Sequence, residues 1–418
     1  MINYQYVLLE CQQAYRKAAV YDAFLELNLK TILNVPRFAE DVAKQLELNS
    51  DALSRFLHAA AHLGLVKKTD KKFMAIINGP SYSKDSSIVL FWLFNSKLAD
   101  ALKFRPKSFN ELSDYGREML EAVVKNNLII QDEHKKYSIP VATRKYLLSD
   151  SLDYIGHRIK HFEKIMFPMF SVKGLVGALK TGKSQWSAFF NNEVTHPFAL
   201  YKDNPVLLEI FTNGLHQLNT DDDKAIVSKL KIDGIKSILD VGGGSGAFVL
   251  QILKKCEPIE YVDIYELPDA IPLMKKTFYK YSPKESRVRF VPGSFLEPTK
   301  DGNLSGIPSS QQYDLIILGW ILHDWTDKTN IEILKRVFYH LKPSKKIVIL
   351  EAILPENKIS DVCFSDMAML LQTEGRERTF SEYKQLLFTS GFSNISTNKT
   401  DTRRQAITAT RCIMRSRL

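Results

Sequence analysis

The stretch Ile238-Leu-Asp-Val-Gly-Gly-Gly-Ser-Gly246 decides the fold, because it joins a buried-looking strand to a glycine-rich turn. A helical pattern follows at Phe248–Lys254. Glycine lets the backbone turn tightly and lets a ligand approach the chain closely. The spacing is G-x-G-x-G rather than the G-x-G-x-x-G of dinucleotide-binding turns, so no pyrophosphate has to be held. The turn predicts a nucleoside-like ligand lying across it, with Asp240, Gly242 and Gly244 as contacts.

Short apolar strands alternate with helical segments along this half of the chain, which predicts a doubly wound α/β fold with a parallel sheet. Two further strands, near Ser393–Thr397 and Gln405–Thr410, have no long helix between them and are expected to form an antiparallel hairpin at the sheet edge. The strands expected in the parallel part are Ser237–Val241, Tyr261–Tyr265, Arg287–Val291, Tyr313–Leu318 and Lys346–Glu351.

Polar residues follow three of these strands, where open α/β sheets place their ligands. Glu266 ends the second strand, and its carboxylate can accept hydrogen bonds from both hydroxyls of a ribose. A lone glutamate at a strand end is more often simply solvated, but this one follows the glycine turn in the expected order. Ser294 and Phe295 follow the third strand and would offer an adenine one polar contact and one apolar face.

The fourth strand is followed directly by Trp320-Ile-Leu-His-Asp-Trp325. A single histidine usually belongs to a core or a surface. Here His323 stands between two tryptophans and beside Asp324, at the edge of the sheet where a ligand is expected. The position favours a functional histidine.

From these motifs the chain resembles the small-molecule O-methyltransferases that include the plant caffeic-acid enzymes, the animal hydroxyindole enzymes and many bacterial natural-product enzymes. The resemblance covers nearly all of residues 205–418. The matching stretches are Leu239–Gly246, Glu266-Leu-Pro268, Leu322-His-Asp-Trp325, Val348–Pro355, Asp366-Met-Ala-Met-Leu370, Gly375-Arg-Glu-Arg-Thr379, Glu382 with Tyr383, and Gly391-Phe392.

The resemblance implies a class I methyltransferase Rossmann-like sheet with S-adenosyl-L-methionine as cofactor. It implies that His323 is the general base that deprotonates the acceptor hydroxyl and that Glu351 and Glu377 flank and orient it. It also implies cofactor contacts from Gly242, Gly244, Glu266 and Leu267, and a substrate pocket lined by Met367, Met369 and Asp324. No metal is expected.

The chemistry of the residues agrees with these roles. A phenol has a pKa near 10, so its ionisation at pH 7 costs roughly 4 kcal/mol at ~1.4 kcal/mol per unit. A histidine held by a carboxylate is a suitable acceptor for that proton. The chain departs from the family at Ser294, where an acid is common, and at Gly319 and Trp320, where many members carry Lys or Arg near the cofactor.

The first half of the chain predicts an α-rich winged-helix domain, single or in tandem. Helical segments precede the two-stranded patterns Leu65–Ile76 and Leu128–Ile139, and the Lys-Lys-aromatic triplet of the first recurs in the second. In the family such a domain serves dimerisation, so a homodimer is expected. The domain boundaries expected are 1–80 and 81–154 for the winged-helix units, 155–218 for an aromatic-rich helical connector lining the substrate site, and 219–418 for the catalytic domain.

Composition sets further bounds. The 418 residues are 45% apolar and 25% charged, as in ordinary globular proteins, with a formal net charge of +10. The positive charges are spread along the chain, so nucleic acid is not expected as a partner. A membrane is not expected either, because no apolar run approaches the ~18 residues that a membrane span needs. Four dispersed cysteines and the lack of a signal-peptide pattern or a long apolar run favour a cytoplasmic protein.

Two alternatives stay open beside O-methylation of a small aromatic or polyketide-like hydroxyl compound. A same-fold enzyme could use the cofactor for N- or C-methylation, decarboxylation or hydroxylation. A winged-helix regulator would need a basic recognition helix, whereas the candidate helices Ala52–Leu63 and Arg117–Val124 carry few basic residues.

Overall fold

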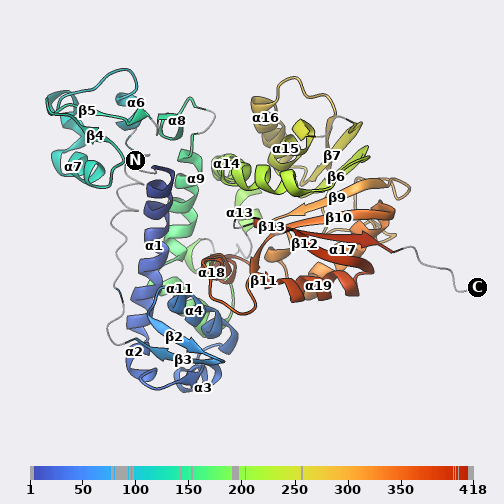
Figure 1. Cartoon of the computed structure of the whole chain (residues 1–418), viewed down its shortest axis with the longest axis horizontal. Coiled ribbons are helices and arrows are strands. Elements are labelled where there is room, and N and C mark those ends of the chain that lie inside the picture. The colour runs from blue at the N-terminus through green and yellow to red at the C-terminus, as the bar shows by residue number, and fades with distance from the viewer. Residues whose placement is uncertain are drawn as a thin grey trace, which may run out of the picture. The chain divides into compact units, whose positions relative to one another are not determined.

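The computed structural model describes residues 4–76, 98–141, 144–151, 154–190, 197–202, 204–255, 258–398 and 404–412, with the single residues 80, 93, 96, 400 and 402. The chain divides into two compact units, residues 1–195 with 209–217 and residues 196–208 with 218–418. The first unit runs from blue to green in Figure 1, and most of the second runs from green to red.

The N-terminal part of the first unit joins helices to a small antiparallel sheet of order β1-β3-β2. The expected hairpin is confirmed, with Val66 opposite Ala75 and Thr69 opposite Lys72. Asn49 caps the helix before the hairpin, as its side chain accepts a hydrogen bond from the Ala52 N–H at 2.9 Å. The elements are α1 (Tyr4–Glu26), α2 (Leu29–Ile32), β1 (Arg37–Phe38), α3 (Ala39–Leu46), α4 (Ser50–His62), β2 (Val66–Thr69) and β3 (Lys72–Ala75).

The rest of the first unit repeats the hairpin in a smaller form and then becomes helical. The second hairpin is confirmed as two short strands, β4 (Ile130–Gln131) and β5 (Tyr137–Ser138). The segment before α7 is a 3₁₀ helix, η1, and Gly116 at φ 75° separates it from α7. The helices are α6 (Leu98–Ala101), η1 (Asn110–Tyr115), α7 (Arg117–Lys125), α8 (Arg144–Leu147), α9 (Gly156–His161), the π-helix η3 (Phe162–Met166), α10 (Phe167–Met169), α11 (Val172–Thr181) and α12 (Trp186–Phe189).

The second unit is built on a sheet of order β12-β13-β10-β9-β6-β7-β8, with β11 paired to β10. The strands from β10 to β8 pair in parallel, and β13 runs antiparallel to both β10 and β12. The expected doubly wound sheet and its antiparallel edge hairpin are both confirmed. The strands are β6 (Ser237–Val241), β7 (Tyr261–Glu266), β8 (Val288–Pro292), β9 (Tyr313–Gly319), β10 (Leu341–Leu354), β11 (Arg378–Thr379), β12 (Phe392–Asn398) and β13 (Arg404–Arg411).

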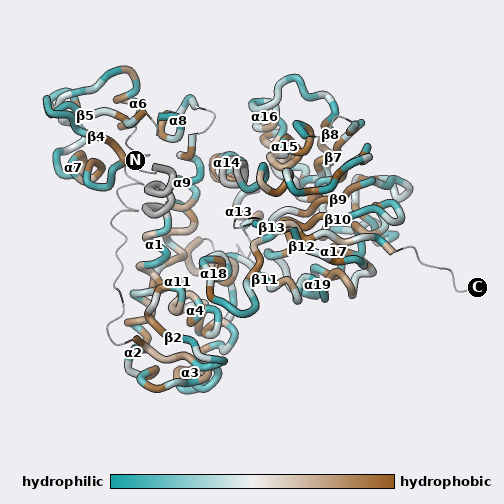
Figure 2. The backbone as a smooth tube through the Cα atoms, in the orientation of Figure 1, coloured by the Kyte–Doolittle hydropathy of each residue, from teal (hydrophilic) through white to brown (hydrophobic). Residues whose placement is uncertain are grey.

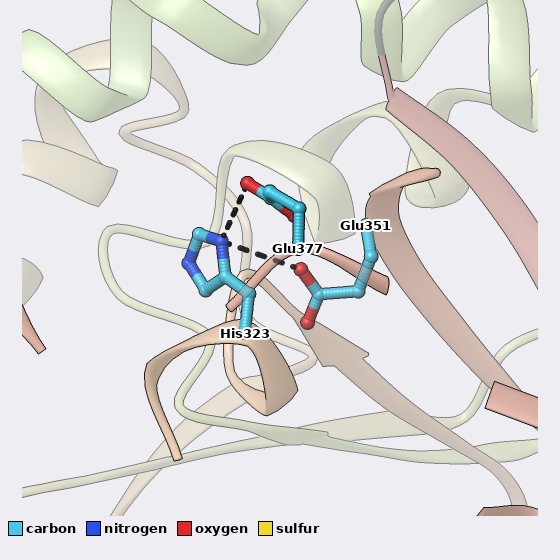
Figure 3. A group of neighbouring side chains, drawn as sticks. All are labelled: His323, Glu351 and Glu377. Carbon is cyan, nitrogen blue, oxygen red and sulfur yellow. Dashed lines mark hydrogen bonds and ion pairs between the residues drawn. The ribbon is translucent and has the colours of Figure 1, made fainter. Parts of the chain in front are cut away.

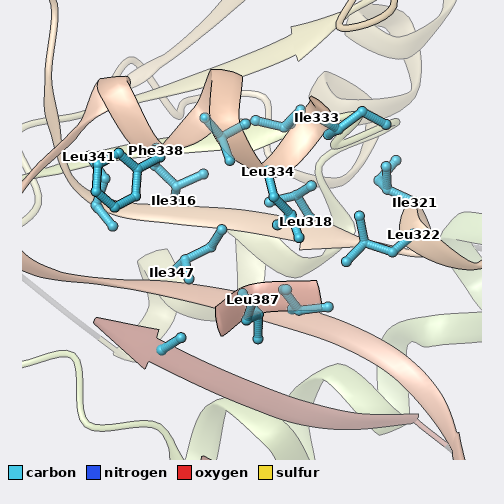
Figure 4. Close-up of a cluster of buried hydrophobic side chains, with 14 of the residues drawn as sticks. Ile316, Leu318, Ile321, Leu322, Ile333, Leu334, Phe338, Leu341, Ile347 and Leu387 are labelled. Carbon is cyan, nitrogen blue, oxygen red and sulfur yellow. The ribbon is translucent and has the colours of Figure 1, made fainter. Parts of the chain in front are cut away.

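Helices cover both faces of this sheet. On one face, Ile316, Leu318 and Ile347 pack against Leu334 of α17 and Leu387 of α19 (Figure 4). The opposite face packs against α14, α15 and α16. The helices are α13 (Pro197–Lys202), α14 (Pro205–Lys229), α15 (Ala247–Lys255), α16 (Ile271–Tyr281), the 3₁₀ helix η4 (Leu322–Asp324), α17 (Asp327–His340), α18 (Val362–Gln372) and α19 (Phe380–Thr389).

The central strands form because both of their faces are buried. All five residues of β6 are buried, and the apolar character of the neighbouring strands is visible in Figure 2. Burial of each Leu or Ile side chain contributes ~1.5–3 kcal/mol, which fixes the strands whose carboxyl ends carry the candidate site. Among the described residues, no helix is both long and apolar enough to cross a membrane.

Candidate active site

The glycine turn has the geometry that its sequence predicts. Gly242 and Gly244 have φ values of 66° and 56°, which favour glycine. A Cβ on Gly242 would lie 2.3 Å from Cδ1 of Ile321, so the backbone there approaches the end of β9 closely. A Cβ on Gly244 would meet nothing within 4 Å, so the turn is open above that residue.

Glu266 is brought directly to this turn. Its Oε1 accepts a hydrogen bond from the Gly244 N–H at 3.0 Å, and its Oε2 accepts one from the Leu267 N–H at 2.9 Å. Burial raises the pKa of Glu266, while these two hydrogen bonds act in the opposite direction. Each oxygen keeps a lone pair for another donor. Asp240 is buried beneath the turn, and burial, with the nearby Glu266 charge, raises its pKa to about 7.

The expected adenine contacts lie beside the turn. The Phe295 ring is 3.7 Å from the position of a Cβ on Gly242 and packs edge-on against Trp325 at 6.2 Å between centroids. The Ser294 hydroxyl is engaged locally, since it accepts a hydrogen bond from the Leu296 N–H at 3.3 Å. The structure therefore places Phe295 at the turn and gives Ser294 a role in shaping its own loop.

His323 meets both predicted acids. Its Nδ1 lies 3.2 Å from Oε1 of Glu377 and 3.7 Å from Oε2 of Glu351 (Figure 3). Its Nε2 lies 3.7 Å from Oδ1 of Asp324. A hydrogen bond from Nδ1–H to Glu377 would fix the tautomer in which Nε2 carries the lone pair. In that tautomer Nε2 is the ring nitrogen that can accept a proton.

The turn that carries His323 is fixed by hydrogen bonds from distant segments. Oε1 of Glu351 accepts the N–H groups of Ile321 and Leu322 at 3.0 and 2.8 Å. Arg378, which is 2% exposed, donates to the carbonyls of Leu322 and Trp325, each at 2.8 Å. These contacts fix the backbone on either side of His323 and thereby the position of its imidazole.

Glu377 is held just as firmly. Its N–H donates to Oδ1 of Asp366 on α18 at 3.0 Å, and the next residue, Arg378, pairs with Ile353 across β10 and β11. A Cβ on Gly375 would lie 2.0 Å from the carbonyl oxygen of His323, so only glycine permits this approach. The Arg-Glu-Arg-Thr stretch is thus a scaffold as well as a source of one acid.

Burial and charge oppose each other at His323. Burial lowers the pKa of His323, but Glu351, Asp324 and Glu377 together raise it to about 10. Burial raises the pKa of Glu351 to about 7 and that of Asp324 to about 6. The neighbouring carboxylates therefore favour the protonated imidazole, which serves as a base only in its neutral form.

We expect the unfolding free energy to fall as the pH rises from 7 to 10. The pKa of His323 is about 10 in the folded chain against an ordinary 6.5, so the folded state binds the extra proton between these values. The stability from that proton is complete below 6.5 and is lost as the pH approaches 10. Thermal melts at pH 7 and 9.5 should show a smaller drop in Tm for His323→Gln than for the wild type. An equal drop in both proteins would contradict the assignment.

The other site residues expected from the sequence lie on the neighbouring elements of the second unit. The Trp320 ring lies 4.9 Å from the imidazole, and its backbone is left-handed at φ 58°. Gly319 is the last residue of β9. Met367 is fully buried on α18 and Met369 is half-buried, one turn from Asp366. Leu267 is 40% exposed beside Glu266.

Some residues that support the candidate site were missed by sequence reasoning. Arg378 and Asp366 stand within stretches that the sequence singled out, yet their contacts with the His323 turn and with Glu377 involve residues far away in the chain. Tyr201 of α13 is buried, and burial together with the charge of Asp324 raises its pKa. No motif signals Tyr201.

His323, Glu351 and Glu377 offer ligand atoms that lie within 4.8 Å of one another, a grouping that could also hold a metal ion. Oε1 of Glu351 already accepts two backbone hydrogen bonds. Only one imidazole is present in the group, and its Nδ1 is within hydrogen-bonding distance of Glu377. The arrangement suits a shared proton at least as well as an ion.

A largely parallel sheet with a glycine turn, an acid on the next strand and a buried histidine beside acids suits an enzyme that transfers a group from a nucleoside-containing cofactor. The sequence model of a family described as O-methyltransferase domain matches residues 173–393, and the chain belongs to that family. Acetylserotonin O-methyltransferase of Mus musculus is 29% identical over 227 residues, 53% of this chain and 56% of that enzyme. The matched part thus spans little more than half of that relative.

Solved structures share the fold. Human N-acetylserotonin methyltransferase in complex with SAM matches with a TM-score of 0.69 at 22% identity, over 78% of this chain and 94% of its own. Mitomycin 7-O-methyltransferase matches with a TM-score of 0.56 at 18% identity, over 96% of this chain and 95% of its own. The class I methyltransferase fold expected from the sequence is confirmed.

Proposed function

We propose that the chain transfers the methyl group of S-adenosyl-L-methionine to a hydroxyl of a small aromatic or polyketide-like molecule, with His323 as general base. The observation that carries this proposal is the orientation of His323, whose Nδ1 faces two buried acids while Nε2 points away from them. Membership of the O-methyltransferase family supports the same reaction.

The residues at the glycine turn fit the cofactor. The open space above Gly244 leaves room for a ligand across the turn, and both oxygens of Glu266 keep lone pairs for ribose hydroxyls. Phe295 beside Gly242 offers a flat apolar face for the adenine. The human acetylserotonin enzyme of the same fold is described in complex with SAM. Asp240, Leu267, Gly319 and Trp320 are further proposed contacts.

S-adenosylmethionine, held by Glu266 and the Gly242–Gly244 turn, would supply an activated methyl group for transfer to the acceptor oxygen. Nε2 of His323 takes the hydroxyl proton, and Glu351 and Glu377 stabilise the imidazolium that results. General-base help contributes ~10²–10⁴ in rate, and alignment of the reacting atoms contributes ~7–11 kcal/mol. The positive charge of a bound sulfonium near His323 would lower the pKa of the imidazole and so favour the neutral base.

The acceptor pocket is proposed to include Met367, Met369 and Asp324. Asp324 is 9% exposed and lies on the Nε2 side of His323, so it faces the region where an acceptor would bind. Met369 is half-buried and offers a flexible apolar surface for a ring. We propose in addition that two copies of the chain pair through their N-terminal units, which light scattering would test.

The proposed reaction is tested with labelled S-adenosylmethionine and a panel of phenolic acceptors. The product should gain the mass of one methylene, fragmentation should place the methyl on oxygen, and the rate should survive dialysis against a chelator. Methyl on nitrogen or carbon, or loss of carbon dioxide, would establish the same-fold alternative. A rate that falls on chelation and returns with a divalent cation would contradict the metal-free mechanism, and tight salt-dependent binding of random duplex DNA without any transfer would favour a regulator.

A further inference from the structure

A buried ion pair lies at the carboxyl end of the central strands, outside the set of residues assigned above. Arg404 is the first residue of β13 and is 3% exposed. Its Nη2 pairs with Oδ1 of Asp223 on α14, which is fully buried. The guanidinium carbon lies 5.8 Å from the ring centroids of both Phe248 and Trp320.

The pair leaves polar atoms unsatisfied. Nε of Arg404 and Oδ2 of Asp223 are buried and have no hydrogen-bond partner among the described residues. Among the described residues, the Arg404 side chain makes a single hydrogen bond, which it donates to Asp223. A buried donor or acceptor without a partner is destabilising, and more so when the group is charged. Burial lowers the pKa of Arg404 to about 10, although the charge of Asp222 opposes that shift.

The position of Arg404 relates it to the cofactor site. Arg404 pairs with Ala352 on β10, and Gly319 pairs with Leu350 on the same strand, so both residues stand at one end of the sheet. Nη1 of Arg404 is 4.0 Å from where a Cβ on Gly319 would lie. Arg404 therefore brings a cation to the end of the sheet that carries Gly319 and Trp320.

Trp320 links this pair to the reacting centre. Its ring is 4.9 Å from the His323 imidazole and 5.8 Å from the Arg404 guanidinium carbon. A ligand with its sulfur near His323 and its nucleoside across Gly242–Gly244 has one part left to place, the amino-acid end. That end carries an α-carboxylate and an α-ammonium, which are complementary to an arginine and an aspartate.

We propose that Arg404 and Asp223 bind the amino-acid end of S-adenosylmethionine. Nη1 of Arg404 donates to the α-carboxylate, and Oδ2 of Asp223 accepts from the α-ammonium. The inference rests on the proposed function, because it takes the cofactor from there.

The test is calorimetric binding of two ligands to the full chain. S-adenosylhomocysteine carries the amino-acid end, and its decarboxylated analogue 5′-(3-aminopropylthio)-5′-deoxyadenosine lacks the carboxylate. The wild type should bind S-adenosylhomocysteine about 10–100-fold more tightly, as one charge-assisted hydrogen bond predicts. Arg404→Gln should reduce that ratio to about threefold or less while the affinity for the decarboxylated analogue stays the same.

Arg411→Gln is the matched control. Arg411 lies at the other end of β13, where it donates to the carbonyl of Tyr339 and stacks on Phe338. This variant should keep the wild-type ratio. Because a lone change at Arg404 leaves Asp223 buried and unpaired, the double variant Asp223→Asn with Arg404→Gln replaces the ion pair by two neutral amides and serves if the single variant does not fold.

A wild-type ratio near one, or a ratio that Arg404→Gln or the double variant leaves intact, would overturn the inference. Binding of the decarboxylated analogue separates this failure from that of the proposed function. If the wild type binds the analogue but does not prefer S-adenosylhomocysteine, the proposed role of the ion pair is wrong and the proposed function is unaffected. A wild type that binds neither ligand removes the proposed function and the inference together.

Discussion

Replacing His323 by alanine is expected to lower kcat/KM for methyl transfer by ~10²–10⁴, the usual contribution of a general base. Nε2 of His323 is the proposed acceptor of the hydroxyl proton, and no other imidazole is placed between two buried acids in the described part of the chain. The dissociation constant of S-adenosylhomocysteine should stay within about threefold, because the proposed cofactor contacts lie on other residues. Steady-state kinetics measures kcat/KM, and calorimetry measures the dissociation constant of S-adenosylhomocysteine.

Glu377→Gln is a milder variant that tests the same assignment, because it removes a neighbouring charge and keeps His323. In the wild type, Nδ1 of His323 lies 3.2 Å from Oε1 of Glu377. A glutamine oxygen could still accept a hydrogen bond from Nδ1–H, but the negative charge would be lost. The rate should fall less than in His323→Ala, and the pKa of His323 should drop because one of its three neighbouring carboxylates is removed. If His323→Ala kept more than a third of the wild-type rate on a true acceptor, the assignment of the base would be wrong.

Replacing Glu266 by alanine should raise the dissociation constant of S-adenosylhomocysteine by about a hundredfold or more. Two hydrogen bonds from ribose hydroxyls to a carboxylate contribute ~1.5–3 kcal/mol each, and ~1.4 kcal/mol corresponds to a factor of ten. The variant also removes the acceptor of the Gly244 N–H, which loosens the turn. Isothermal titration calorimetry measures the change directly.

Glu260→Ala provides the control for Glu266→Ala. Glu260 lies directly before the first residue of β7, at the end of the strand away from Glu266, and is exposed. Its carboxylate pairs with Nζ of Lys236 at 2.8 Å. An exposed ion pair of this kind contributes ~0–1 kcal/mol, so cofactor affinity should not change. Equal losses in the two variants would point to general destabilisation of β7 and would remove Glu266 from the ribose site.

The strands were predictable because both faces of a central parallel strand are buried, and this leaves a continuous apolar run in the sequence. β6 begins and ends where the sequence indicates, at Ser237 and Val241. β10 is longer than expected, from Leu341 to Leu354, since its polar first half pairs irregularly with β9. Such a segment has no apolar run to mark it.

The site was predictable to the extent that its residues sit in motifs. His323, Glu351 and Glu377 come from three separate stretches, and the resemblance to a family predicted that they meet. The supporting contacts were not predictable, since Asp223 and Arg404 are 181 residues apart and neither belongs to a recognisable pattern. Pairing across a sheet and onto its covering helix depends on tertiary packing, which local sequence does not encode.

A crystal structure with bound S-adenosylhomocysteine tests the central claim most directly. We predict adenine against Phe295, ribose hydroxyls on Glu266, and the sulfur facing Nε2 of His323 with space between them for a methyl group and an acceptor oxygen. A nucleoside bound away from the Gly242–Gly244 turn, or a sulfur directed away from His323, would contradict the account.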